Sequence, residues 1–181
     1  MCTDAGWGPQ DASQPRENDD RIVTIDECKS LLGNISIRMG GPLDWSTIRE
    51  KRPSRSTCEA EIKSVDEGCK KVETIHNLHS DLSILLSSPS PIFKPTHLLN
   101  DNQGSVDWSH GHGTKKMKHI NIHEMCVRAA REQGDIAMSH IPGILNPADL
   151  MTKEHQDVRH FTALRDLILV PRIRGGCLPA T

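Results

Sequence analysis

Four acidic residues stand where side chains from distant parts of the chain can meet. Asp4 lies in the first expected strand, Glu61 in the first turn of a long helix, Asp101 at the end of a strand and Asp149 in the first turn of a later helix. Converging carboxylates repel one another, and a bound divalent cation relieves that repulsion. Two such ions, about 3.5–4 Å apart, stabilise the attacking and leaving oxygens of a phosphodiester displacement. Because the chain has 24 Asp and Glu residues, each of the four can equally be a helix cap or a solvated charge.

Two glutamates compete for the helical position. Val65, Cys69 and Val72 follow Glu61 at helical spacing and share its face. Glu59 falls nearly a quarter-turn away from that apolar stripe. We therefore expect Glu61 to point toward a sheet, and Glu59 stays as the alternative.

The elements that would hold these residues change their apolar period along the chain. After the opening strand, we expect strands within 21–38 and over 43–48, joined by a turn at Gly40-Gly41-Pro42. A helix over 58–86, weakened by Gly68, should follow, and then a strand over 96–100. The remaining elements should be helices over 103–109 and 120–133, a strand over 135–141, a helical turn from Asn146-Pro147 and a last helix over 157–169. The first strands should form an antiparallel meander. Strands that come first and then alternate with helices predict an α/β domain with a mixed sheet.

The composition limits both the core and the partners. Aromatic residues make up 3% of the chain and Tyr is absent, so the core must rest on Ile, Leu, Val and Met. The formal net charge of −2 excludes the strong basic excess of a general nucleic-acid binder. Local basic patches must therefore make any contact with phosphates.

The cysteines and the apolar runs indicate an intracellular protein. The six Cys residues include no C-x-x-C pair, so free thiols in a reducing compartment are the simplest interpretation. No signal peptide opens the chain, and no apolar run is long enough to span a membrane. We expect a cytoplasmic or nuclear location and no membrane partner.

Six short blocks occur in order along the chain. They are Thr3-Asp4-Ala5 with Trp7, Gly40-Gly41-Pro42-Leu43 with Trp45-Ser46, Ser56-Thr57-Cys58-Glu59-Ala60-Glu61-Ile62, Asn100-Asp101-Asn102-Gln103, Thr114-Lys115 with Lys118-His119-Ile120, and Asn146-Pro147-Ala148-Asp149-Leu150-Met151-Thr152-Lys153. Over roughly residues 2–169 this series resembles the ribonuclease H domain of copia-type LTR retrotransposon polyproteins.

The resemblance implies a fold and a reaction. The implied fold is ribonuclease H-like, with a five-stranded mixed sheet in the order 3-2-1-4-5 flanked by helices, over residues 1–169, before a disordered tail at 170–181. The implied enzyme is an endonuclease that hydrolyses the RNA strand of RNA–DNA hybrids. Asp4, Glu61, Asp101 and Asp149 would be catalytic and would hold two Mg²⁺ ions, or Mn²⁺. The reverse transcriptase domain of the same polyprotein would be a partner.

Basic and polar residues near the acidic ones are candidates for contact with nucleic acid. The candidates are Arg49, Lys51, Asn102, Gln103, Lys115 and Lys118. Lysine and arginine would bind phosphates in a salt-dependent way. Asn102 and Gln103 are placed to reach sugar hydroxyls, and the 2′-OH distinguishes RNA from DNA.

Two other hypotheses stay open. The first is a catalytically inactive remnant that binds nucleic acid or a partner. It is suggested by Asn34, which stands where the family usually has an aromatic residue, and by a chain that begins three residues before Asp4, which predicts a truncated first strand. The second is a zinc module on His110, His112, His119 and His123, although no Cys pair completes a usual zinc pattern.

Overall fold

The computed structural model describes residues 1–6, 29–87, 94–111, 122–153 and 157–169. The elements, in chain order, are β1 (Cys2–Gly6), β2 (Leu31–Arg38), β3 (Gly41–Arg49), α1 (Thr57–Leu85), β4 (Thr96–Asn100), α2 (Gln103–Ser109), α3 (Ile122–Glu132), β5 (Ile136–His140), the 3-10 helices η2 (Gly143–Leu145) and η3 (Pro147–Met151), and α4 (Val158–Leu169). No helix among these described residues is both long and apolar enough to cross a membrane.

The five strands form one mixed sheet in the order β3-β2-β1-β4-β5, as expected. β1 pairs antiparallel with β2 over five residues, from Cys2 opposite Ile35 to Gly6 opposite Leu31, and parallel with β4 at Leu99 and Asn100. β2 and β3 are antiparallel, and β4 and β5 are parallel. β1 is therefore the central strand, and it brings its residues next to the end of β4.

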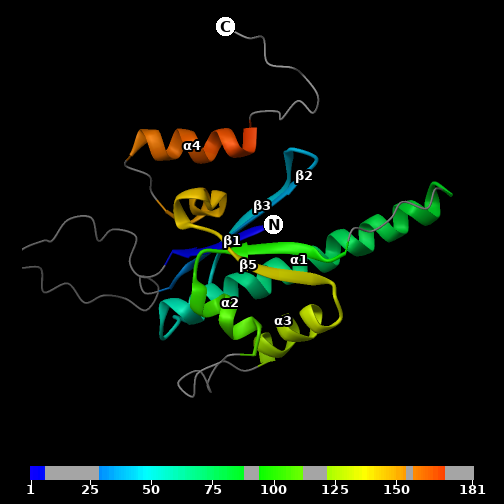
Figure 1. Cartoon of the computed structure of the whole chain (residues 1–181), viewed down its shortest axis with the longest axis horizontal. Helices are drawn as coiled ribbons and strands as arrows, with labels where there is room; N and C mark the ends of the chain where they lie inside the picture. Colours follow the sequence, from blue (N-terminus) through cyan, green and yellow to red (C-terminus); the bar gives the residue numbers. More distant parts are fainter. Residues whose placement is uncertain (7–28, 88–93, 112–121, 154–156, 170–181) are drawn as a thin grey trace, which may run out of the picture.

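Helices cover both faces of the sheet (Figure 1). α1, α2 and α3 lie on one face, and η3 and α4 lie on the other. The larger core cluster is on the first face and is built mainly from aliphatic residues such as Ile62, Leu98 and Val127, as the composition predicts. Trp108 joins them and is 2% exposed, so one aromatic side chain does fill the core. The second face buries Ile35 and Ile168 with Ala148.

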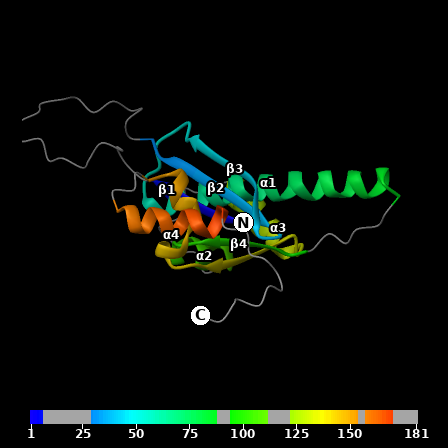
Figure 2. The ribbon, with the colours of Figure 1, turned by 90° about the horizontal axis from the view of Figure 1, so that it is seen from above.

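α1 is longer than the sheet that it packs on. Its buried residues end at Val72, and the rest of the helix continues past the sheet in both views (Figures 1 and 2). Leu78, Leu82 and Leu85 on this distal part are 58%, 44% and 78% exposed. The proximal half of α1 therefore carries the contacts that position the site.

Two glycines let helical segments approach the sheet closely. A Cβ on Gly68 of α1 would lie 2.8 Å from Cγ2 of Thr3 and 3.2 Å from Cδ2 of Leu98. A Cβ on Gly33 of β2 would lie 2.6 Å from Cγ2 of Thr152, which follows η3. α1 runs through Gly68 without a break, and Gly68 permits close packing of α1 on β1 and β4; that it weakens the helix stays a prediction.

The expected boundaries need two corrections. The hairpin between β2 and β3 turns at Met39 and Gly40, with φ of 53° and 87°, and not at 40–42. A two-residue hairpin turn with positive φ at both positions matches the twist of its strands, so Gly41 and Pro42 already belong to β3. Within the expected strand region 21–38, β2 begins only at Leu31. The part over 21–28, and the tail at 170–181, lie outside the described residues.

Asn34 is a buried polar residue that lies between Thr3 of β1 and Ser46 of β3. It lies in β2 with no exposed surface, and neither Oδ1 nor Nδ2 has a hydrogen-bond partner among the described residues. An unsatisfied buried polar group costs about 1–3 kcal/mol. Asn34 is therefore a local weakness in the sheet.

Substituting Gly33 tests the close approach of η3. Gly33→Ala should lower stability by about 1–3 kcal/mol, because the added methyl group forces Thr152 and Met151 away from β2. Gly41→Ala is the matched control, since its Cβ would meet nothing within 4 Å. Urea unfolding of the three proteins measures the effect. Equal midpoints for the two variants would show that the packing is not tight.

Candidate active site

The centre of the sheet places two of the four acidic residues side by side. Asp4 lies on β1 with no exposed surface, and Asp101 directly follows the last residue of β4. The parallel register sets Thr3 opposite Asn100, so the residues that follow each of them are neighbours. Asp4 and Asp101 therefore meet where β1 and β4 end their pairing.

Glu61 reaches the same point from α1. Ser56 caps this helix by accepting from the Glu59 backbone N–H at 3.1 Å, and Glu59 Oε2 accepts from the Arg55 backbone N–H at 2.9 Å. Ser56 and Glu59 have the spacing of a capping box, although the Glu59 carboxylate accepts from Arg55, one residue before the cap. Glu59 is therefore engaged at the start of the helix. Glu59 also pairs with Lys63 at 3.1 Å. One half-turn on, Glu61 is 7% exposed and turned to the sheet, as the helical spacing predicts.

Asp4, Glu61 and Asp101 form a carboxylate cluster. One carboxylate oxygen from each lies within 4.8 Å of the other two. Asp101 Oδ1 is buried and has no hydrogen-bond partner among the described residues. Oxygen donors in this arrangement suit a hard divalent cation such as Mg²⁺, and a buried carboxylate oxygen without a donor suggests an ion as its partner. The residues therefore fit the metal that the sequence predicts.

The segment around η3 brings the fourth carboxylate from the opposite face. Asn146 caps η3 by accepting from the Ala148 backbone N–H at 3.2 Å, and its Nδ2 donates to the carbonyl oxygen of Thr3 at 3.0 Å. Asp149 is 5% exposed and accepts from Lys153 Nζ at 2.9 Å. The expected helical turn is present, although it is a short 3-10 helix. Asp149 lies beside the carboxylate cluster but is not one of its three members.

The proximity of these groups changes their acidity. Burial raises the pKa of Glu61 to about 8, and the charges of Asp4 and Asp101 add to the rise, while hydrogen bonds from Asn100 and the Ala5 backbone oppose it. Burial and the charge of Asp4 also raise the pKa of Asp101. For Asp149, burial and Asp4 raise the pKa to about 6, against the opposing effect of Lys153. Several carboxylates with shifted pKa values that gather in one place are typical of a functional site.

Several residues that hold the cluster were not predicted as site residues. Asn100 Nδ2 donates to Glu61 Oε2 at 2.9 Å and to Thr3 Oγ1 at 3.1 Å. Ser64 Oγ donates to the Asp4 carbonyl oxygen at 2.7 Å. Thr152 Oγ1 donates to Asp4 Oδ2. Asn100 and Thr152 belong to sequence blocks that were recognised, so the blocks were the available signal.

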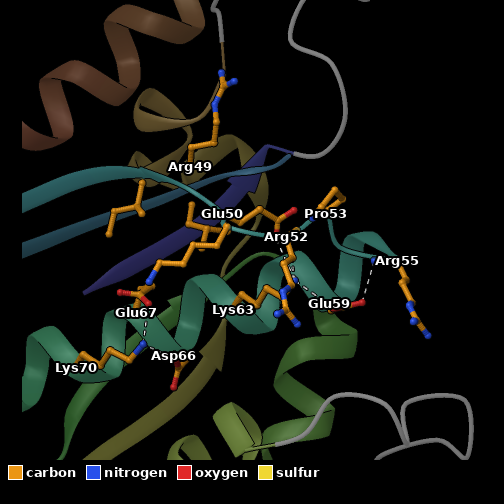
Figure 3. A pocket seen from close by; sticks show the side chains of 13 residues that line it. Arg49, Glu50, Arg52, Pro53, Arg55, Glu59, Lys63, Asp66, Glu67 and Lys70 are labelled. Carbon is orange, nitrogen blue, oxygen red and sulfur yellow. Dashed lines mark hydrogen bonds and ion pairs between the residues drawn. The ribbon is translucent and has the colours of Figure 1, made fainter. Parts of the chain in front are cut away.

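The basic candidates for nucleic-acid contact that the structure describes lie beside the start of α1. Arg49 and Lys51 are exposed and line a cavity of about 860 Å³ beside the start of α1, together with Arg52 and Arg55 (Figure 3). Lys63 and Lys70 line the same cavity and pair with neighbouring carboxylates.

The polar candidates already have structural contacts. Asn102 caps α2 by accepting from the Ser105 backbone N–H at 3.1 Å. Gln103 donates to Asp107 Oδ1 at 2.7 Å. Their contact with sugars stays a prediction. Lys115 and Lys118 lie outside the described residues, as do His112, His119 and the side chain of His123, so the zinc hypothesis is left with His110 alone in the described part.

The raised pKa of Glu61 predicts that, without divalent ions, the free energy of unfolding depends on pH. Between about pH 4.5 and 8 the unfolded chain releases a proton that the folded chain keeps, so stability falls as pH rises through this window. Glu61→Gln removes this dependence and should be the more stable protein at pH 8, by at most about 5 kcal/mol. Thermal unfolding in EDTA from pH 4 to 9 measures it, with Glu59→Gln as control. Parallel curves for wild type and Glu61→Gln would contradict the assignment.

Comparisons with known proteins point to one class of mobile-element protein. The chain is 29% identical over 140 residues to the Retrovirus-related Pol polyprotein from transposon RE2 of Arabidopsis thaliana, which covers 76% of the chain and 9% of that protein. The related polyprotein from transposon RE1 is 29% identical over 113 residues, or 62% of the chain and 7% of that protein. The chain thus spans less than a tenth of the length of either relative. No family model matches it.

Solved structures show the fold. The RNase H1 of the halophilic archaeon Halobacterium salinarum superposes with a TM-score of 0.54 at 15% identity, over 91% of this chain and 96% of that one. The LC11-RNase H1 isolated from compost gives a TM-score of 0.53 at 15% identity, over 83% and 89%. The chain therefore has a ribonuclease H-like fold and is homologous to a segment of retrotransposon Pol polyproteins.

Proposed function

We propose that this chain is the ribonuclease H module of a copia-type retrotransposon polyprotein, formed by residues 1–169, and that it hydrolyses the RNA strand of RNA–DNA hybrids. The observation that carries the proposal is the cluster of Asp4, Glu61 and Asp101 at the centre of the sheet, with Asp149 beside it. A polyprotein that copies RNA into DNA makes such hybrids in the cytoplasm or nucleus. Its reverse transcriptase domain is the expected partner.

The acidic residues would hold Mg²⁺, or Mn²⁺, and their neighbours would keep them in place. Divalent ions at such a site supply activation of water and stabilisation of the leaving oxygen. The Asn100 amide fixes the rotamer of Glu61, and the Thr152 hydroxyl fixes one oxygen of Asp4. Hydrolysis adds water to the phosphorus and breaks the bond to the 3′ oxygen, which leaves a 3′-OH and a 5′-phosphate. Preorganised ligands reduce the reorganisation that the reaction requires.

The basic cavity supports a path for the hybrid. The connector that carries Lys51, Arg52 and Arg55 leads directly into the capped start of α1, two turns or less from Glu61. Phosphates bound there would lie at the N-terminal end of α1, where the helix dipole also favours anions. The cavity thus offers backbone contacts near the carboxylate cluster, although the whole chain carries no basic excess.

The decisive experiment is cleavage of a labelled RNA–DNA hybrid in Mg²⁺. The wild type should cut the RNA strand, and Asp101→Asn should lose at least about 100-fold in rate, because a metal-binding carboxylate is removed. Asp81→Asn, on the exposed distal part of α1, should keep the wild-type rate. If a folded wild-type chain does not cut, the inactive remnant becomes the better account.

Substitutions in the basic cavity test how the hybrid is bound. Lys51→Gln with Arg52→Gln should weaken hybrid binding for every sequence and make the salt dependence shallower, since each lost phosphate contact removes about one unit of slope. Lys70→Gln is the control within the cavity, because Lys70 already pairs with Asp66 and Glu67. Fluorescence anisotropy over a series of KCl concentrations measures both quantities. An unchanged slope in the double variant would move the binding path elsewhere.

A further inference from the structure

One ammonium group lies among the four carboxylates. Lys153 Nζ is 2.9 Å from Asp149 Oδ1 and 3.4 Å from Asp4 Oδ1. The two carboxylates are 7% and 1% exposed, whereas the lysine side chain is 44% exposed. Lys153 therefore reaches in from solvent and places its charge between two buried acids.

This contact divides the acidic site into two unequal parts. One carboxylate oxygen from each of Asp4, Glu61 and Asp101 lies within 4.8 Å of the other two, and Asp101 Oδ1 has no donor in the described part of the chain. Asp149 is outside this group, and one of its oxygens is already taken by Lys153. Lys153 thus supplies a cation to Asp149 and, at the longer distance, to one oxygen of Asp4, whereas no described residue forms an ion pair with Glu61 or Asp101.

We propose that Lys153 is a built-in cation that occupies the Asp149 half of the acidic site, so that one divalent ion binds readily at Asp4, Glu61 and Asp101 and a second must displace the lysine. The inference rests on the proposed metal site. Lys153 is here a positioning residue, because it acts through Asp4 and Asp149.

The geometry makes such a displacement physically reasonable. An ammonium near Asp149 lowers the negative potential that a second ion would experience, so it competes with that ion directly. The lysine has a flexible four-carbon stem and a half-exposed side chain, so its head can move to water without opening the fold. Asp4 stays held through its other oxygen by Thr152. The first half of the site therefore keeps its shape when Lys153 leaves.

The same contact should support the fold when no divalent ion is present. Buried carboxylates without a compensating cation are costly, and removal of one partner of a buried pair leaves that cost unrelieved. Loss of the Lys153 charge should therefore destabilise the ion-free protein. Added divalent ion should remove that difference, because the ion then supplies the positive charge.

Calorimetric titration with Mn²⁺ at constant pH tests the inference on the intact chain. The wild type should bind one ion tightly and a second weakly. Lys153→Gln should bind the second ion about tenfold more tightly or better. Lys153→Arg, which keeps the charge, should stay close to wild type. Lys70→Gln should also stay close to wild type, because it removes another lysine paired with a buried aspartate four residues away, outside the acidic site.

Thermal unfolding provides a second readout. In EDTA, Lys153→Gln should unfold at a lower temperature than Lys70→Gln, and saturating Mn²⁺ should close the gap. Identical Mn²⁺ isotherms for wild type and Lys153→Gln would overturn the inference even if the hybrid is cleaved. A tightened second ion without any cleavage would support the inference and contradict the proposed nuclease activity.

Discussion

The repulsion between buried carboxylates at the centre of the sheet is the constraint on which the rest of this structure depends. Asp4 and Glu61 are almost fully buried, and Asp101 lies within reach of both. Charges cannot be buried so close together unless donors or cations compensate them. Here the compensation comes from every surrounding element: the Asn100 amide from β4, the Ala5 backbone from β1, the Thr152 hydroxyl and the Lys153 ammonium from beyond η3. The remaining cost of burial and repulsion raises the pKa values of Glu61 and Asp101.

Such a site requires that backbone segments from both faces reach one strand. The side chains of β1 alternate, so Asp4 shares a face with Cys2 and points toward η3, whereas Thr3 and Ala5 face α1. Glycine at position 33 admits η3 and Thr152 to Asp4, and glycine at position 68 admits α1 to Thr3. A side chain at either position would increase the spacing between a helical segment and the sheet. The carboxylates would then separate, whatever their own chemistry.

Local patterns predicted the elements because each depends on nearby residues. The helical spacing of Val65, Cys69 and Val72 identified the buried face of α1 and favoured Glu61 over Glu59, and the structure turns Glu61 to the sheet and gives Glu59 to the helix cap. The strand order and the four acidic residues came from the ordered blocks, not from periodicity. Contacts across 97 and 148 residues, such as Asn100 with Thr3 and Thr152 with Asp4, have no local pattern and emerged only from the fold. The predicted hairpin turn began one residue too late and ended two residues too late, because the backbone torsions at Met39 and Gly40 form the turn and Met is not a typical turn residue.

The buried polar groups of this domain should make its stability depend on a bound divalent ion. Asn34 is buried without a hydrogen-bond partner among the described residues, and the converging carboxylates are only partly compensated by Lys153, so the ion-free fold carries at least two local costs. A ligand that binds only the folded state adds stability in proportion to the logarithm of its concentration over its dissociation constant. A divalent ion at Asp4, Glu61 and Asp101 would therefore stabilise the sheet centre as well as serve the reaction. Lys153 offsets only the part of the repulsion that involves Asp149 and one oxygen of Asp4. The ion-free chain should for that reason be foldable yet less stable than the ion-bound one, and the two states should differ most where β1, β4 and α1 meet.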